Sequence, residues 1–285
     1  MPSTITDGSC AAHCNRSTQG TLVRTRLRHT LQWLTQAPRR DVSSTSTERP
    51  SRHVVIVGAT GVVGRAAVEH FAALGDWKIT MVSRRPPVYA TDAAHVPLDL
   101  TDEATCAAVL GTMQDVTHLI YTAIAGVNIS DPEEIVTNTA MLRNALLSLE
   151  AGSRNTLRHV SILQGRKAYA EYDPAMMLWP LKEKHPRHGG SVPTESQSSW
   201  YFTQEDFLKA RRALPGVAWT YTIWRPPTVL GFVPGAPLNM VAALGVYAAV
   251  SRELGEPLRY PGGPPIVKQL CDSRVLARAL SWCAA

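Results

Sequence analysis

An apolar run that leads directly into a glycine-spaced turn most constrains the fold of this chain. Residues 54–57 are apolar at every position, which predicts a parallel strand buried on both faces. Gly58, Gly61 and Gly64 follow with the spacing G-x-x-G-x-x-G, and residues 63–74 then repeat apolar side chains at helical spacing up to Gly75. A glycine triplet alone is a weak signal. Strand, turn and helix in this order predict a dinucleotide site, with the pyrophosphate on free helix N–H groups.

The end of the next predicted strand, residues 77–83, indicates which dinucleotide is bound. The strand runs into Arg84 and Arg85, where no acidic residue is present. An acidic residue here would bind the 2′-hydroxyl of adenosine, whereas arginine accommodates a 2′-phosphate. The pair therefore favours NADP(H) over NAD(H), although a solvated surface pair is the simpler alternative.

Further apolar segments alternate with helical patterns along the chain. Strands are predicted at 95–98, 117–122, 157–163 and 219–224. Helices are predicted to begin at Asp131, which is followed by Pro132, and at Thr203, which opens a capping-box-like run to Leu214; two more are predicted at 241–254 and 275–282. The alternation predicts an α/β fold with a Rossmann-type doubly wound parallel sheet and helices on both faces.

The ends of these strands supply the predicted cofactor contacts. Asp99 is placed to meet the adenine edge, and the small residues 123–126 let the backbone pass close to a bound ring. The full set expected to contact the cofactor is Gly58, Thr60, Gly61, Val62, Val63, Gly64, Ser83, Arg84, Arg85, Asp99, Leu100, Thr122, Ala123, Gln164 and Val229.

Charge is concentrated in the first 52 residues. The formal net charge is +6, and residues 1–52 contain eight Arg and three acidic residues, so the rest of the chain is nearly neutral. We therefore expect a disordered basic leader at 1–52, a reductase domain at 53–285 and no nucleic-acid partner. A possible amphipathic helix at 22–34 is also compatible with a mitochondrial presequence, the alternative to a cytoplasmic location.

Other function classes receive little support from composition. No apolar run approaches the ~20 residues of a membrane span. Five scattered cysteines are typical of reduced thiols, and the cluster at 10–14 lacks the partner ligands of a metal site, so we expect no metal. The segments 173–199 and 232–270 are predicted to lie on the substrate side, the first as a long loop.

The chain from residue 53 onward resembles a known family. It is similar to the atypical short-chain dehydrogenases typified by plant progesterone 5β-reductase and iridoid synthase, and most to their bacterial and fungal members. The matching segments, in order and at family-like spacing, are residues 58–64, 83–86, 115–118, 138–144, 163–169, 201–206, 225–226, 238–239 and 245–249.

The resemblance implies a catalytic pair, Lys167 and Tyr201. It further implies NADP(H)-dependent reduction of an α,β-unsaturated carbonyl or a ketone on a small hydrophobic metabolite, plausibly in secondary metabolism. Phe202 stands where the family has a second tyrosine, and Gln164 immediately precedes the glycine as in the microbial members. The family's chains continue for several tens of residues, so the C-terminal substrate-side region is expected to be truncated.

Alternatives to a self-contained reductase remain open, since an incomplete pocket could mean an oligomer that fills the gap, a different substrate or a degenerate protein. A second copy of the chain, in a homodimer, could complete the pocket. A regulator or pseudoenzyme could keep the NADP site without turnover. A nucleotide-sugar epimerase or dehydratase would normally carry a Tyr-x-x-x-Lys pair after the fifth strand, and this sequence has no such pair there.

Overall fold

The computed structural model describes residues 52–169, 180–185, 187, 199–235, 239–260 and 268–285. The chain divides into two compact units, Met1–Glu48 and Arg49–Ala285, and all described residues belong to the second. The predicted leader, and most of the loop predicted at 173–199, therefore lie outside the described residues.

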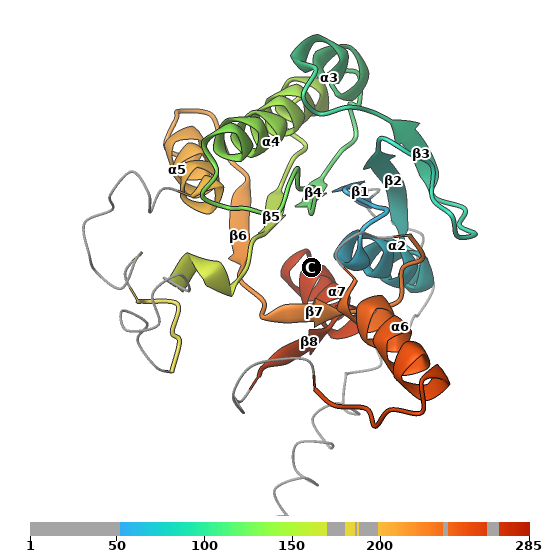
Figure 1. Ribbon diagram of the computed structural model, residues 1–285. Coiled ribbons are helices and arrows are strands. Elements are labelled where there is room, and N and C mark those ends of the chain that lie inside the picture. The colour runs from blue at the N-terminus through green and yellow to red at the C-terminus, as the bar shows by residue number, and fades with distance from the viewer. Residues whose placement is uncertain (1–51, 170–179, 186, 188–198, 236–238, 261–267) are drawn as a thin grey trace, which may run out of the picture. The chain divides into compact units, whose positions relative to one another are not determined.

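A six-stranded parallel sheet forms the centre of the second unit, as predicted (Figure 1). The strand order is β3-β2-β1-β4-β5-β6. The chain adds strands outward on one side of β1 and then, from β4 onward, on the other side, so the order reverses between β1 and β4. The strands are β1 (Arg52–Val57), β2 (Trp77–Ser83), β3 (Ala94–Pro97), β4 (His118–Tyr121), β5 (His159–Leu163) and β6 (Thr220–Trp224). In open α/β sheets, ligands bind outside the carboxyl ends of the strands at such a reversal.

Helices cover both faces of this sheet (Figure 1). The helices α3 (Glu103–Leu110), α4 (Pro132–Ser153) and α5 (Trp200–Arg212) lie on one face, and α2 (Val62–Leu74) and α7 (Ser273–Cys283) lie on the other. Leu142, Leu146 and Leu149 of α4 are fully buried against one face, while Phe71 of α2 and Leu280 of α7 are buried against the other. Two separate cores therefore hold the sheet in place.

A second, smaller sheet lies beyond β6 in the chain and was not predicted. It pairs β7 (Thr228–Leu230) with β8 (Leu270–Asp272) in parallel, and α6 (Met240–Glu253) lies between these strands in sequence. Strands of three residues are too short to produce a readable alternation of side chains. The eight-residue helix α3 was missed for the same reason, because it presents only about two turns of pattern.

The predicted start of α5 was wrong by four residues. Ser199, rather than Thr203, is the N-cap, and its hydroxyl accepts a hydrogen bond from the Tyr201 N–H at 3.2 Å. The aromatic triplet 200–202 thus forms the first turn of the helix and is buried. The Thr203 hydroxyl instead bonds the Thr139 hydroxyl at 2.6 Å, which ties α5 to α4.

Other boundaries and one core position differ slightly from the prediction. Leu74 was expected on the buried stripe of α2, but it is the last residue of the helix and is 46% exposed. Gly75 does end α2, in the left-handed conformation with φ +74°, as predicted. Within the described ranges, no helix is both long and apolar enough to cross a membrane.

Candidate dinucleotide and catalytic site

The glycine turn connects β1 to α2 at the carboxyl edge of the sheet. Gly58 has φ +80°, and a Cβ there would come within 2.7 Å of both the Ala123 backbone nitrogen and the Thr122 hydroxyl. A Cβ on Gly64 would approach the Gly58 carbonyl oxygen to 2.3 Å, which is closer than atoms can pack. The backbone of the turn therefore requires glycine at both positions, as the spacing predicted.

The N-terminus of α2 differs from the other helix starts that the structure describes. Its N-cap, Gly61, has no side chain to accept a hydrogen bond, and the first turn holds no acidic residue. The N-caps of α3, α4, α5, α6 and α7 all accept backbone N–H groups through a side chain: Asp102, Asp131, Ser199, Asn239 and Asp272. The amides at Val62 and Val63 are thus left for an outside acceptor, which is the requirement of an anion site.

The end of β4 packs directly against the glycine turn. The Thr122 hydroxyl donates to the Val57 carbonyl at 2.8 Å, and the Thr122 N–H bonds the same oxygen at 2.9 Å. Asn138 of α4 fixes the loop that follows, because its side chain bonds both the N–H and the carbonyl of Ala125, at 2.9 and 2.8 Å. The structure therefore brings the predicted contacts Gly58, Thr122 and Ala123 together at the topological reversal.

The end of β2 presents the two arginines to solvent. Arg84 and Arg85 are exposed, and neither guanidinium has an ion-pair partner among the residues that the structure describes. The Ser83 hydroxyl donates to the Arg85 carbonyl at 2.8 Å and also contacts His95 Nε2 at 3.0 Å. The backbone at Arg85 is thereby anchored, while both cationic side chains remain available.

Three predicted cofactor contacts occupy different environments. The Asp99 carboxylate is exposed and accepts the Thr101 N–H and hydroxyl, and these hydrogen bonds lower the pKa of Asp99. The Leu100 side chain is buried in the core beneath α3 and α4, and Val229 in β7 packs against the core beneath α2 and α7. Leu100 can therefore meet a ligand only through its backbone.

The predicted catalytic tyrosine lies beside the end of β5. Tyr201 is 8% exposed, and a Cβ added to Gly165 would come within 3.0 Å of its hydroxyl oxygen. Lys167 follows two residues later in the short 3-10 helix η1 (Arg166–Tyr169), with an exposed side chain. Tyr201 and the turn that carries Lys167 are therefore neighbours, although they are far apart in sequence.

Gln164 connects these two elements. Its side-chain amide donates to the Tyr201 carbonyl at 2.7 Å, and its backbone N–H bonds the Trp224 carbonyl at 2.8 Å. The side-chain oxygen of Gln164 is buried and has no hydrogen-bond partner among the residues that the structure describes. An orphaned acceptor at this position fits a site that receives a donor from a bound molecule.

A charged cluster around Glu205 supports the same region and was not predicted from the sequence. The carboxylate contacts Lys209 Nζ at 2.7 Å, Arg225 Nη2 at 2.9 Å and Arg187 Nη2 at 3.1 Å. Burial alone would raise the pKa of Glu205, but the hydrogen bond from Lys209 and the two guanidinium charges lower it. Arg225 also stacks on the Tyr169 ring, so the cluster holds the segments after β5 and β6 against α5. Glu205 and Arg225 lie in the matching segments 201–206 and 225–226, but no local pattern pairs them with each other or with Arg187.

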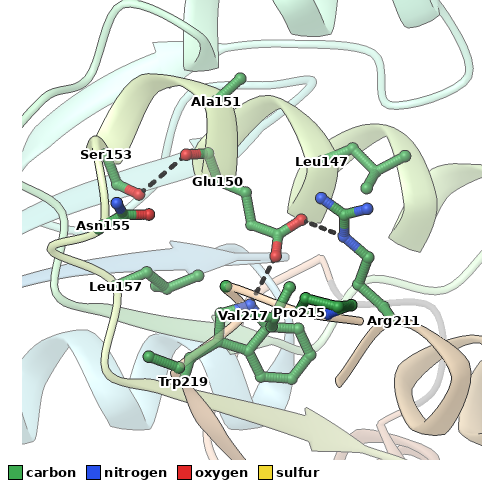
Figure 2. A pocket seen from close by; sticks show the side chains of 12 residues that line it. Leu147, Glu150, Ala151, Ser153, Asn155, Leu157, Arg211, Pro215, Val217 and Trp219 are labelled. Carbon is green, nitrogen blue, oxygen red and sulfur yellow. Dashed lines mark hydrogen bonds and ion pairs between the residues drawn. The ribbon is translucent and has the colours of Figure 1, made fainter. Parts of the chain in front are cut away.

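A hollow of about 430 Å³ lies away from this site (Figure 2). Its lining includes residues just before β5 and β6, which places it at the amino edge of the sheet. Glu150 accepts from Trp219 Nε1 at 2.6 Å and from Arg211 Nε at 2.8 Å, so both carboxylate oxygens are partnered. The hollow is therefore separate from the glycine turn and from Tyr201.

Known proteins share both the sequence pattern and the fold. The profile of the PRISE-like Rossmann-fold domain matches residues 91–267. An (S)-8-oxocitronellyl enol synthase of Nepeta racemosa is 33% identical over 215 residues, which are 73% of this chain and 54% of that protein. A 3-oxo-Δ(4,5)-steroid 5β-reductase of Arabidopsis thaliana is 33% identical over 246 residues, or 81% of this chain and 60% of that protein. The chain spans about half the length of the curated relatives it matches.

Solved structures agree on the fold. A GDP-L-fucose synthetase of Naegleria fowleri, determined with NADP bound, superposes with a TM-score of 0.60 at 18% identity, covering 86% of this chain and 72% of that one. At this identity the likeness establishes the doubly wound architecture and nothing finer.

Proposed function

The chain belongs to the PRISE-like Rossmann-fold domain family, and on this premise we propose that it is an NADP(H)-dependent oxidoreductase. The proposed reaction is reduction of an α,β-unsaturated carbonyl or a ketone on a small hydrophobic metabolite, in secondary metabolism. The observation that carries the proposal is the position of Tyr201, a buried residue whose hydroxyl adjoins Gly165 at the carboxyl end of β5. The related enol synthase and steroid reductase support the same class of substrate.

The residues of the glycine turn fit a dinucleotide. Gly58 and Gly64 permit the tight turn, in which a Cβ would collide with neighbouring backbone atoms, and the uncapped amides of α2 suit a pyrophosphate. Arg84 and Arg85 would bind the 2′-phosphate of NADP(H), because an unpaired guanidinium forms charge-assisted, forked hydrogen bonds with phosphate oxygens. Bound NADPH would supply the hydride for the reduction.

The proposed role of Tyr201 is to donate a hydrogen bond to the carbonyl oxygen of the substrate. Such a bond strengthens as negative charge develops on that oxygen, so it lowers the energy of the transition state more than that of the bound substrate. Lys167 would stabilise, through its positive charge, the negative charge that develops at the tyrosine oxygen as the hydroxyl donates. Gln164 would hold Tyr201 in place through the 2.7 Å bond to its carbonyl.

The alternative function is an NADP-binding regulator, which uses the same cofactor site but has no turnover. A decisive assay records NADPH oxidation by the purified chain against a panel of enones, enals and ketones. Turnover of any substrate supports the reductase and removes the regulator. NADPH binding without turnover across the panel would favour the regulator, and absence of dinucleotide binding would contradict both functions.

A further inference from the structure

Arg65 occupies an unusual position at the start of α2. It directly follows Gly64, and its guanidinium lies 4.7 Å from the centre of the Tyr89 ring and 5.0 Å from the centre of the Phe232 ring. Its Nε donates to Glu69 at 2.7 Å, while Nη1 is buried and has no hydrogen-bond partner in the described part of the chain. The guanidinium is therefore held both by the ion pair with Glu69 and by cation–π attraction to the two rings.

Tyr89 connects Arg65 to the segment that carries the two exposed arginines. The tyrosine lies four residues after Arg85, and its hydroxyl donates to the Ala59 carbonyl in the glycine turn at 2.9 Å. Burial raises the pKa of Tyr89 to about 12, so the hydroxyl keeps its proton and remains a donor at neutral pH. Ser83 fixes the other end of the segment through its bond to the Arg85 carbonyl. Arg84 and Arg85 therefore lie between two anchors.

We propose that Arg65 is a positioning residue for dinucleotide preference. By stacking on Tyr89, it keeps the segment 84–89 folded over the glycine turn, so that Arg84 and Arg85 are presented to the 2′-phosphate. Phe232, which follows β7, contacts the same guanidinium and restricts its movement. The inference deepens the proposed function and rests on it, because it assigns the preference for NADP(H) to a residue outside the phosphate-binding pair.

The proposal predicts a selective effect on affinity. NADH lacks the 2′-phosphate, so loosening the segment 84–89 leaves NADH binding unchanged. NADPH binding depends on the position of both arginines and is weakened. If Arg65 supported only the glycine turn, replacing it would instead weaken the binding of both dinucleotides equally, since both place a pyrophosphate there.

The test compares the dissociation constants of NADPH and NADH by fluorescence titration of the full chain. Arg65→Ala is expected to raise the Kd for NADPH about three- to tenfold, the range of one partly buried cation–π contact, without changing the Kd for NADH. Tyr89→Phe keeps the ring and loses the hydrogen bond to Ala59, and it should also raise the Kd for NADPH. The double variant should weaken NADPH binding by less than the product of the two effects, because both act through the position of the segment 84–89.

Arg143→Ala provides a matched control. Arg143 also lies over an aromatic ring, that of Phe207 at 6.0 Å, but on α4 across the sheet from α2, and it should leave both constants unchanged. If Arg65→Ala weakened the binding of both dinucleotides equally, or changed neither Kd, the inference would be overturned. NADPH binding by the parent protein would still support the proposed cofactor. A parent protein that binds neither dinucleotide overturns both.

Discussion

Replacing His118 by Gln is expected to make the fold less sensitive to acid. His118 is buried in β4, its ring lies 4.9 Å from the Trp77 ring, and its neighbour across the sheet is His159. Burial, followed by the nearby charge of His159, lowers the pKa of His118 from 6.5 to about 4. The folded protein therefore holds this imidazole neutral at a pH where the unfolded chain would protonate it.

The sign and size of the effect follow from linkage. Between pH 6.5 and about pH 4 the unfolded chain binds the extra proton, so the contribution of His118 to the free energy of unfolding is complete above pH 6.5 and is lost as the pH falls toward 4. At ~1.4 kcal/mol per pKa unit, the full loss is about 3 kcal/mol, of which about 2 kcal/mol occurs between about pH 7 and about pH 5.

Urea unfolding at these two pH values measures the effect directly. The parent protein should lose about 2 kcal/mol more than His118→Gln on going from about pH 7 to about pH 5. The substitution also loses the 2.8 Å contact between His118 Nδ1 and the Thr117 hydroxyl. This cost cancels when the change in the free energy of unfolding between the two pH values is compared for each protein. His185→Gln, outside the sheet, is the control. Equal losses in His118→Gln and the parent protein would refute the argument, because His118 would then not be held neutral by the fold.

Three further variants test the site. Tyr201→Phe should lower kcat by ~10²–10³ and leave the Kd for NADPH unchanged, and an unchanged kcat for every active substrate would make Tyr201 a packing residue. Replacing Arg84 and Arg85 together by Ala should abolish a preference for NADPH of roughly tenfold or more in paired NADPH and NADH titrations; equal affinities in the parent protein would contradict the assignment. Gly64→Ala should abolish dinucleotide binding in the same titrations and lower the melting temperature, because its Cβ would meet the Gly58 carbonyl oxygen at 2.3 Å. Gly245→Ala, in open space within α6, should instead stabilise the helix by about 0.5–1 kcal/mol, and similar melting shifts in both glycine variants would count against the steric argument.

The sequence alone was sufficient to predict the elements that have a long pattern of residues and are stabilised by contacts between neighbours along the chain. β1 and α2 are predictable because an apolar strand, three glycines and a helical stripe are all encoded within 25 consecutive residues. The start of α4 is predictable for the same reason, since Asp131 accepts the N–H groups of residues two and three positions later. In the same way, the sequence alone placed Arg84 and Arg85 at the end of β2.

Only the tertiary structure decided which distant residues meet. Besides Lys209, which is one helical turn away on α5, Glu205 contacts Arg187 and Arg225, and no local pattern specifies these two arginines. The start of α5 moved to Ser199 because burying the aromatic triplet against Ile129 and Ala168 outweighs the local capping preference of Thr203. The contact of Arg65 with Phe232 joins two residues that are more than 160 positions apart in the sequence. Local preferences are set by neighbours along the chain. These contacts arise only when the folded sheet brings segments that are distant in sequence close together at its carboxyl edge.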